Sequence, residues 1–210
     1  MRKSFCSLIS FLLFSLLACG AASAHWYVAP TGNDANNGSK RKPLKTIAAA
    51  LQRVNPGDTV FLREGSYGEF VVPTRSGKPG KMITLKSYPG EIAKIDGSDL
   101  YIKGWGNALV QVNNIDYMQF ENLHICHAHD SENNTDPEGI YITGTSGNIT
   151  FRGCKVYDIK NDCPLVDAKG DWRSAHAILV LGTDDNTPIR NLLIEKCEIF
   201  EIHSGTSEAF

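Results

Sequence analysis

The sequence lacks several features that would assign it to a common class of protein. Its 210 residues carry a formal net charge of −2, so no excess of basic side chains marks a nucleic-acid-binding protein. Beyond the N-terminus, no segment is long and apolar enough to cross a membrane. There is no Cys-X-X-Cys pair, which leaves a zinc-ribbon site without support. Helical patterns are scarce as well, because only one short segment repeats apolar residues with a helical period.

Residues 1–24 have the pattern of a secretory signal peptide. Arg2 and Lys3 give a positive start, a short apolar run follows, and Ala22-Ser23-Ala24 supplies the small residues of a cleavage site. We therefore expect a secreted, periplasmic or extracellular protein whose mature domain is 25–210. The alternative is a lipoprotein anchored at Cys19, because Leu16-Leu17-Ala18-Cys19 resembles a lipidation motif.

A repeat of short strands fills the second half of the chain. The segments Met118–Ile125, Ile149–Val156 and Leu192–Ile199 each alternate apolar and polar residues, with one interruption in the middle. Alternation with period two predicts strands, and repetition of one strand set predicts a solenoid. No helical pattern between the copies would supply the crossovers of an ordinary parallel sheet.

An additional short strand precedes each copy of the repeat, which completes a coil. These strands are Ala108–Val112, Gly139–Thr143 and Ala177–Leu181. The sequence therefore predicts an all-β fold, a right-handed parallel β-helix. Three polar insertions, His127–Glu138, Lys160–Ala175 and Gly182–Arg190, are expected to leave the coils near one corner and to carry the binding chemistry.

Four cysteines follow the signal region. Cys154 and Cys197 occupy the same position of adjacent repeats, so we expect them to stack inside as small buried side chains, with a disulfide as the alternative. Export permits disulfides, so the state of Cys126 and Cys163 stays open.

The one helical pattern, 44–54, is predicted to cap the first coil. Ile47, Leu51 and Val54 share a face, and Thr46 is placed to be the N-cap. The preceding stretch Gly32–Ser39, GNDANNGS, is rich in metal-binding oxygens but fails the spacing of an EF-hand loop, because the position of the bidentate acid is a lysine. Its Asn, Asp and Gly residues instead predict tight turns that lead into the helix.

The order of motifs in the first half resembles a known family. YVAPTGNDANNGS, KPLKTIAAAL, NPGDTVFLREGSY, SGKPGKMITLKSYPGE and IDGS together span Tyr27 to Ser98. This order is similar to the N-terminal region of secreted β-helix proteins, notably pectate lyases of polysaccharide lyase family 9. The resemblance implies a polysaccharide substrate rich in uronate, cleavage by β-elimination, a calcium ion and a lysine or arginine base.

The later coils depart from the pattern of that family. The two rung starts that correspond to its aspartate motifs read DPEGIYI, from Asp136, and SAHAILV, from Ser174, so no calcium ligand or catalytic lysine is carried over by alignment. The sequence also stops at Phe210, where another strand would begin. We therefore expect that the chain is truncated at its C-terminus, as a fragment of a longer β-helix.

The acid-rich insertion Asn161–His176 is the best local candidate for a site. Its acids suit a cation, its bases suit proton abstraction, and its tryptophan suits stacking on a sugar ring. We assign catalytic roles to Lys169, Arg173 and His176, substrate binding to Trp172, and metal binding to Asp162, Asp167 and Asp171.

A second candidate lies near the C-terminus, and a third lies on one strand. Glu208 is assigned a catalytic role and His203 a role in substrate binding. His127 and His129 face the same side of their strand, which suits a metal, but the sequence provides no third ligand.

The sequence favours a monomeric, lyase-like enzyme over two alternatives. One is a non-catalytic β-helix that binds polysaccharide or serves at the cell surface. The other is a glycoside hydrolase, which needs two carboxylates facing each other across a groove. For that pair the chain offers the acids between Asp162 and Asp171, opposite Glu138 or Glu208.

Overall fold

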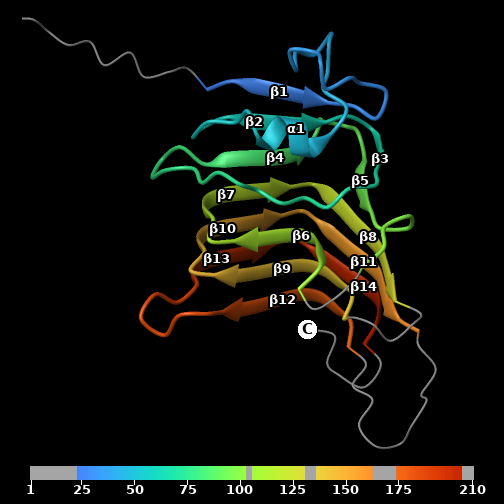
Figure 1. Ribbon diagram of the computed structural model, residues 1–210, viewed down its shortest axis with the longest axis vertical. Coiled ribbons are helices and arrows are strands. Elements are labelled where there is room, and N and C mark those ends of the chain that lie inside the picture. The colour runs from blue at the N-terminus through green and yellow to red at the C-terminus, as the bar shows by residue number, and fades with distance from the viewer. Residues whose placement is uncertain (1–22, 103–105, 131–135, 163–173, 205–210) are drawn as a thin grey trace, which may run out of the picture.

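The computed structural model describes residues 23–102, 106–130, 136–162 and 174–204, which form stacked coils of short strands (Figure 1). The strands build three parallel sheets, so the predicted parallel β-helix is confirmed. The six-stranded sheet contains β1 (His25–Val28), β2 (Thr59–Leu62), β4 (Ile83–Ser87), β7 (Asp116–Glu121), β10 (Gly147–Arg152) and β13 (Arg190–Glu195).

The other two sheets complete each coil. The five-stranded sheet contains β3 (Gly65–Tyr67), β5 (Ala93–Asp96), β8 (Leu123–Asp130), β11 (Lys155–Asn161) and β14 (Glu198–His203). The three-stranded sheet contains β6 (Ala108–Asn113), β9 (Glu138–Gly144) and β12 (His176–Gly182). A full coil therefore runs from the three-stranded to the six-stranded and then to the five-stranded sheet.

The sequence repeat and the stacking register coincide. Ile149 pairs with Met118 on one side and with Leu192 on the other, which is the alignment that the repeat predicts. The interruption in each copy is a corner between two sheets. Asn122, Gly153 and Lys196 hold this corner with φ of 53°, 63° and 55°, a left-handed conformation that turns the chain within a single residue.

Inward-facing side chains form the core as ladders that run from coil to coil. Phe120 and Phe151 are buried and stack with ring centroids 4.5 Å apart. Cys154 and Cys197 carry free thiols in adjacent coils, the first buried and the second half-buried, as predicted for small core residues. Cys126 is also free and buried, and Cys163 lies outside the described residues.

The helix α1 (Ile47–Leu51) packs beside β1 and β2 and is shorter than the expected 44–54. Leu44 instead forms a parallel β-bridge with Val28 at the end of β1. Its backbone is therefore extended and does not join the helix. Thr46 is the N-cap as predicted, since its side chain accepts a hydrogen bond from the Ala49 N–H.

Asp34, within the GNDANNGS stretch, fixes the start of this helix. Its Oδ1 accepts the backbone N–H groups of Lys45 and Thr46 at 2.8 and 2.9 Å, and its Oδ2 accepts the Thr46 hydroxyl. The stretch is therefore a device of the fold, as the sequence predicted. Burial opposes the ionised carboxylate, but these hydrogen bonds outweigh burial and lower the pKa of Asp34.

One expectation about the insertions is wrong. The Gly182–Arg190 connection joins β12 to β13, whereas the other two insertions join the five-stranded to the three-stranded sheet. Figure 1 shows this connection at the left, away from the ends of β8 and β11 at the right. Polar composition marks a loop but carries no information about which sheets it connects, so the sequence alone did not separate the two corners.

Within the described ranges, no helix has the length and apolar character needed to cross a membrane.

Candidate functional site

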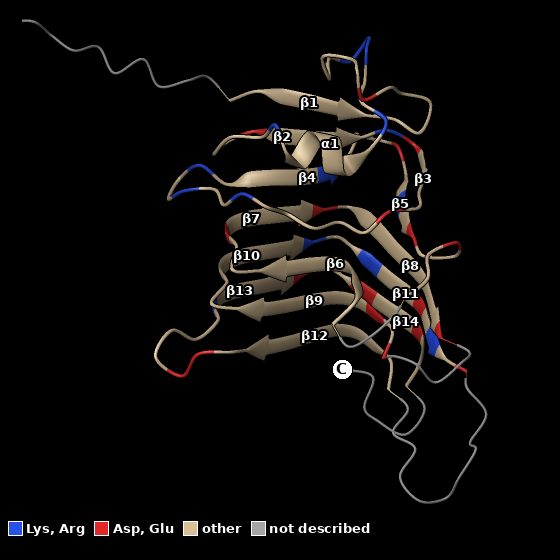
Figure 2. Ribbon diagram, viewed as in Figure 1, with Lys and Arg blue, Asp and Glu red and all other residues tan. Residues whose placement is uncertain are grey.

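A row of cationic and imidazole side chains lies where the five-stranded sheet ends. His129 of β8 pairs in register with Lys160 of β11, and Lys160 pairs with His203 of β14. Neighbouring strands are about 4.8 Å apart, so the row presents one such side chain per coil along the helix axis. Figure 2 shows acidic and basic residues gathered along β8, β11 and β14.

A bulge directly before this row changes the direction of the side chains. His127, Asp158 and Glu201 occupy the same position of successive coils and have φ of 62°, 56° and 55°. Adjacent residues of a regular strand point to opposite faces, but a left-handed bulge residue breaks that alternation. As a result Cys126 and His127, which are neighbours in sequence, both contribute to the outer face.

Asp158 and Asp96 link the histidines of this face. Asp96 Oδ1 lies 2.8 Å from His127 Nδ1, and Asp158 Oδ2 lies 3.1 Å from His129 Nε2 and 3.7 Å from His127 Nε2. Lys160 Nζ contacts the other oxygen of Asp158. Two carboxylates therefore bracket His127, and one of them is shared with His129 and Lys160.

The carboxylates of this cluster are held in the ionised form. Burial alone would raise the pKa of Asp96, but hydrogen bonds from Ser98 and His127 lower it to about 2. Burial also opposes ionisation of Asp158, and its contacts with Lys160 and His129 lower its pKa nonetheless. The hydrogen bond to Asp158 in turn raises the pKa of Lys160, which keeps this amine charged.

Among the residues that the sequence singled out, Asp162 and His203 are brought together. His203 Nδ1 lies 3.6 Å from Asp162 Oδ1, and both side chains are 59% exposed. His176 lies on another sheet, as the first residue of β12, so it is not part of this row. The remaining assigned residues lie outside the described residues: Asp167, Lys169, Asp171, Trp172, Arg173 and Glu208.

His176 belongs to a second polar cluster at the start of the three-stranded sheet. It pairs in register with Glu138, which is 0% exposed and lies in line with the inward-facing Ile140. Within the described part of the chain, the two carboxyl oxygens of Glu138 have no hydrogen-bond partner. The same is true of Nδ1 of His176. Burial raises the pKa of Glu138 to about 8, with a further contribution from Asp136, and burial lowers the pKa of His176.

This burial bears on the hydrolase alternative. A carboxylate pair of a glycoside hydrolase must flank a sugar in a groove. The carboxyl group of Glu138 is enclosed, so it does not face a groove in this structure.

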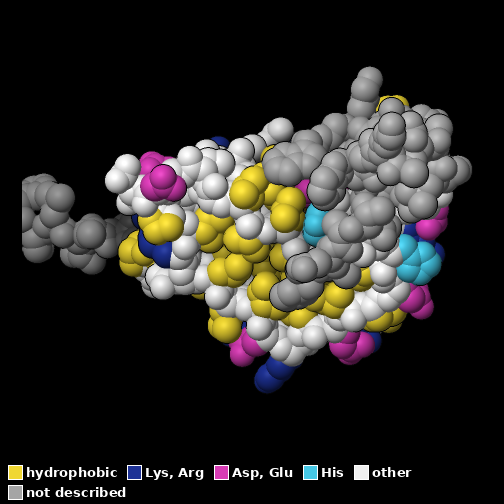
Figure 3. Space-filling model, turned by 90° about the horizontal axis from the view of Figure 1, so that it is seen from below, with side chains coloured by type: hydrophobic (Ala, Val, Ile, Leu, Met, Phe, Trp, Pro, Cys, Tyr) yellow, Lys and Arg dark blue, Asp and Glu magenta, His cyan; other side chains and the backbone are white. Residues whose placement is uncertain are grey.

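Seen from below in Figure 3, apolar side chains cover much of the last coil, with histidine side chains toward one edge. The exposed large apolar residues of this coil are Val180, Leu181, Leu193 and Phe200.

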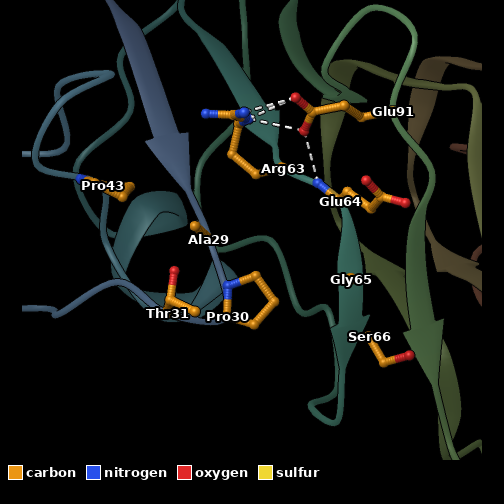
Figure 4. A pocket seen from close by; sticks show the side chains of 9 residues that line it. All are labelled: Ala29, Pro30, Thr31, Pro43, Arg63, Glu64, Gly65, Ser66 and Glu91. Carbon is orange, nitrogen blue, oxygen red and sulfur yellow. Dashed lines mark hydrogen bonds and ion pairs between the residues drawn. The ribbon is translucent and has the colours of Figure 1, made fainter.

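A hollow of about 450 Å³ lies near the other end of the coil, beside β1 and β3 (Figure 4). Arg63 spans it and forms a bidentate pair with Glu91, whose Oε2 also accepts the Glu64 N–H at 2.8 Å. The Arg63 guanidinium, held by Glu91, lowers the pKa of that carboxyl. Because Arg63 and Glu91 satisfy each other, we interpret this hollow as part of the N-terminal cap.

One group of described residues converges closely enough to hold a metal ion. Ligand atoms of Asp96, Cys126 and His127 all lie within 4.8 Å of one another. The sequence identified His127 but not its partners, because Asp96 is 31 positions away. In a regular strand His127 would also face the core like Ile125, so alternation alone would separate it from Cys126. Only the register of β5 on β8 brings them together.

Comparisons with known proteins agree with the fold and the first-half motifs. A family model described as "Pel9A-like, right handed beta helix region" matches residues 26–189. The uncharacterized protein YwoF of Bacillus subtilis is 32% identical over 144 residues, which cover 69% of this chain and 31% of YwoF. Pectate lyase PEL9 of Emericella nidulans is 26% identical over 147 residues, which cover 65% of this chain and 34% of that enzyme. The chain thus spans about a third of the length of these curated relatives.

A solved structure with another activity has the same fold. The GH136 lacto-N-biosidase of Eubacterium ramulus superposes with a TM-score of 0.62 at 17% identity, over 87% of this chain and 35% of that protein. At this level of identity the likeness concerns the fold alone. The family model, in contrast, matches most of the sequence, so the chain belongs to the Pel9A-like family of right-handed β-helix proteins.

Proposed function

We propose that the protein is a secreted, carbohydrate-active protein that binds an acidic polysaccharide and cleaves its uronate linkages by β-elimination. Membership of the Pel9A-like family and the likeness to a pectate lyase support this proposal. We also propose that it acts outside the cytoplasm, because residues 1–24 have the pattern of a signal peptide, and that it is a monomer.

The observation that carries the proposal is the row His129, Lys160 and His203. A uronate polymer presents one carboxylate per sugar unit, and the row presents one cationic or imidazole group per coil. His129 and His203 are 46% and 59% exposed, so they are accessible to a polymer that lies along the helix axis. Charge complementarity of this kind favours a polyanion over a neutral glycan.

β-Elimination needs a base and a group that neutralises the substrate carboxylate. Lys160 suits the second task, because its raised pKa keeps the amine charged and therefore unable to accept a proton. Imidazoles such as His129 and His203 suit the first task, as do the assigned residues His176, Lys169 and Arg173.

Calcium remains part of the proposal through Asp162, Asp167 and Asp171. A calcium ion takes six to eight oxygen ligands. Among the described residues, Asp162 contributes a carboxylate that is already paired with His203. This pair would have to open for calcium to bind. Trp172, as a sugar-stacking residue, and Glu208, as a catalytic residue, likewise remain proposals.

The test is an assay of the 210-residue chain on pectate, alginate and chondroitin, with calcium or with a chelator. A lyase produces an unsaturated sugar, so ultraviolet absorbance rises as the polymer is cut. Reducing ends without that absorbance would support a hydrolase. Retention on an immobilised polysaccharide without either product would support a binding module, and no retention at all would contradict the proposal.

Two variants connect the result to the row. Lys160→Ala should weaken retention on the acidic polymer about tenfold, with a smaller dependence on salt, because one contact between the lysine ammonium and a polymer carboxylate is lost. Lys155→Ala is the matched control, since Lys155 lies on the same strand but pairs with Glu198 in a different row. If the two variants weaken retention equally, the row has no special role in binding. The activity itself would still be decided by the assay.

A further inference from the structure

The face formed by Asp96, Cys126 and His127 has an arrangement that the proposed function does not use. His127 Nδ1 lies 2.8 Å from Asp96 Oδ1, and Cys126 Sγ completes a set of three ligand atoms within 4.8 Å of one another. The donors are one imidazole nitrogen, one carboxylate oxygen and one sulfur. Such a set differs from the all-oxygen cage of calcium and matches the ligands of zinc and its neighbours.

The spacing of the donors suits a small divalent ion. Ligand atoms bound to a tetrahedral zinc ion at about 2.0–2.3 Å are roughly 3.5 Å apart. The separation of His127 Nδ1 from Asp96 Oδ1 is 2.8 Å, and no pair of ligand atoms in the set is more than 4.8 Å apart. We expect side-chain rotations to convert the hydrogen-bonded arrangement into a coordinating one.

The backbone holds two of the donors in place. Cys126 pairs in register with Asp96, and the left-handed bulge at His127, with φ of 62°, aims the imidazole at the same face. Cys126 is buried, whereas the side chains of Asp96 and His127 are 18% and 30% exposed. An ion therefore has access to the site from the solvent side through Asp96 and His127.

Asp158 supplies the outer partner that metal-binding histidines generally have. When Nδ1 of His127 binds a metal, the ring proton resides on Nε2, which lies 3.7 Å from Asp158 Oδ2. Asp158 is itself fixed by His129 and Lys160. At this distance the carboxylate attracts the ring proton, and a small rotation of the ring would bring the two groups into hydrogen-bond range.

We propose that Asp96, Cys126 and His127 form a binding site for a divalent transition metal ion of the zinc type, with Asp158 as its outer partner. Three protein ligands leave one coordination position for water. Binding converts the Cys126 thiol to a thiolate and releases its proton to solvent. The three ligands are not members of the row His129, Lys160 and His203, although Asp158 contacts both His129 and Lys160, and they are distinct from the calcium ligands proposed above.

Cobalt(II) is the probe of choice because its spectrum reports the ligands. The 210-residue chain is freed of metal with a chelator, kept reduced with a phosphine, and titrated with Co²⁺. We expect one equivalent to give a thiolate-to-cobalt charge-transfer band in the near ultraviolet. Zn²⁺ should displace the cobalt and abolish the band, whereas Ca²⁺ in excess should leave it unchanged.

Variants assign the ligands. Cys126→Ser should remove the charge-transfer band, and His127→Ala should raise the dissociation constant by well over tenfold. Asp158→Asn should raise it about tenfold, as expected for an outer partner. Cys154→Ser and His124→Ala are matched controls, since they remove a thiol in the core and an imidazole of another row. Circular dichroism checks that each variant is folded.

Two results would overturn the proposal. One is the absence of a charge-transfer band in the wild-type chain. The other is a band that persists in Cys126→Ser or that disappears in Cys154→Ser, because the thiol ligand would then be elsewhere. Where Cys126→Ser does not fold, Asp96→Asn replaces it. This nearly isosteric change should weaken cobalt binding about tenfold or more, and unchanged binding would count against the site.

Discussion

Glu138 is a buried acid whose protonation is coupled to folding. Its carboxyl group is enclosed by the core, its two oxygens have no hydrogen-bond partner within the described part of the chain, and burial raises its pKa to about 8. The folded state therefore keeps the proton that the unfolded chain releases near its ordinary pKa of 4.5. As a consequence, the free energy of unfolding falls as the pH rises from about 4.5 to about 8.

The first prediction isolates this effect with Glu138→Gln. Between pH 6.5 and 8 the wild-type chain should lose about 2 kcal/mol of stability, and the glutamine variant should lose little, because an amide does not titrate. His176 does not interfere in this window. Its pKa is lowered by burial, so its contribution is present above pH 6.5 and is lost only as the pH falls below that value.

Thermal unfolding followed by circular dichroism measures this slope. A change of 2 kcal/mol corresponds to a shift in Tm of roughly 4–8 °C for a chain of this size. Glu64→Gln is the control, since Glu64 is an exposed glutamate. If wild type and Glu138→Gln show parallel curves of Tm against pH, the proton on Glu138 has no part in stability.

At the scale of elements, the start of α1 depends on a side chain outside the helix. Asp34 accepts two backbone N–H groups and the Thr46 hydroxyl, and the carboxylate of Glu69 accepts the N–H groups of Ile47 and Ala48. The Lys45 N–H directly precedes the N-cap, and the other donors belong to the N-cap or to the first turn of the helix, where no intrahelical partner exists. A helix of five residues depends on such contacts, because it has few hydrogen bonds of its own.

The second prediction concerns Asp34→Ala. The loss of three hydrogen bonds to a charged group should lower the free energy of unfolding by about 2 kcal/mol, as measured by urea denaturation. Asn37→Ala serves as the control, because Asn37 makes a single exposed contact with the Ser39 N–H. Calcium should leave both midpoints unchanged. A calcium-dependent midpoint lost in Asp34→Ala would instead identify the loop as a metal site.

The elements that the sequence predicted correctly are those in which apolar residues alternate. Met118, Phe120, Ile149 and Phe151 all face the core, so their spacing reveals both the strand and its register. The functional face was harder to predict. His127 and His129 were recognisable as neighbours on one strand, but Asp96 and Asp158 join them across coils, and a left-handed bulge determines how His127 points.

At the scale of the whole molecule, the described strands pair only with strands of the coils next to them. One ion pair skips a coil, since Arg190 of β13 reaches Asp116 of β7 at 3.1 Å. The stability of such a solenoid is approximately a sum of terms for single coils and for the interfaces between neighbours. The stacked rings of Phe120 and Phe151 belong to one of the central interfaces. On the N-terminal side β4 and β2 continue the stack to the helix α1, and on the C-terminal side β13 follows β10.

The final prediction removes a central ring. Phe120→Ala should lower the free energy of unfolding by about 3–5 kcal/mol, because both the apolar contacts and the space they filled are lost. Phe200→Ala, which removes an exposed ring stacked on Tyr157, should cost no more than about 1 kcal/mol.

Hydrogen exchange then tests the nearest-neighbour description. In Phe120→Ala the amides of β10–β14 should exchange faster by a larger factor than those of β1 and β2, which retain their contacts with α1. Equal acceleration along the whole chain would mean that the coils unfold as a single unit and that stability is not transmitted from neighbour to neighbour.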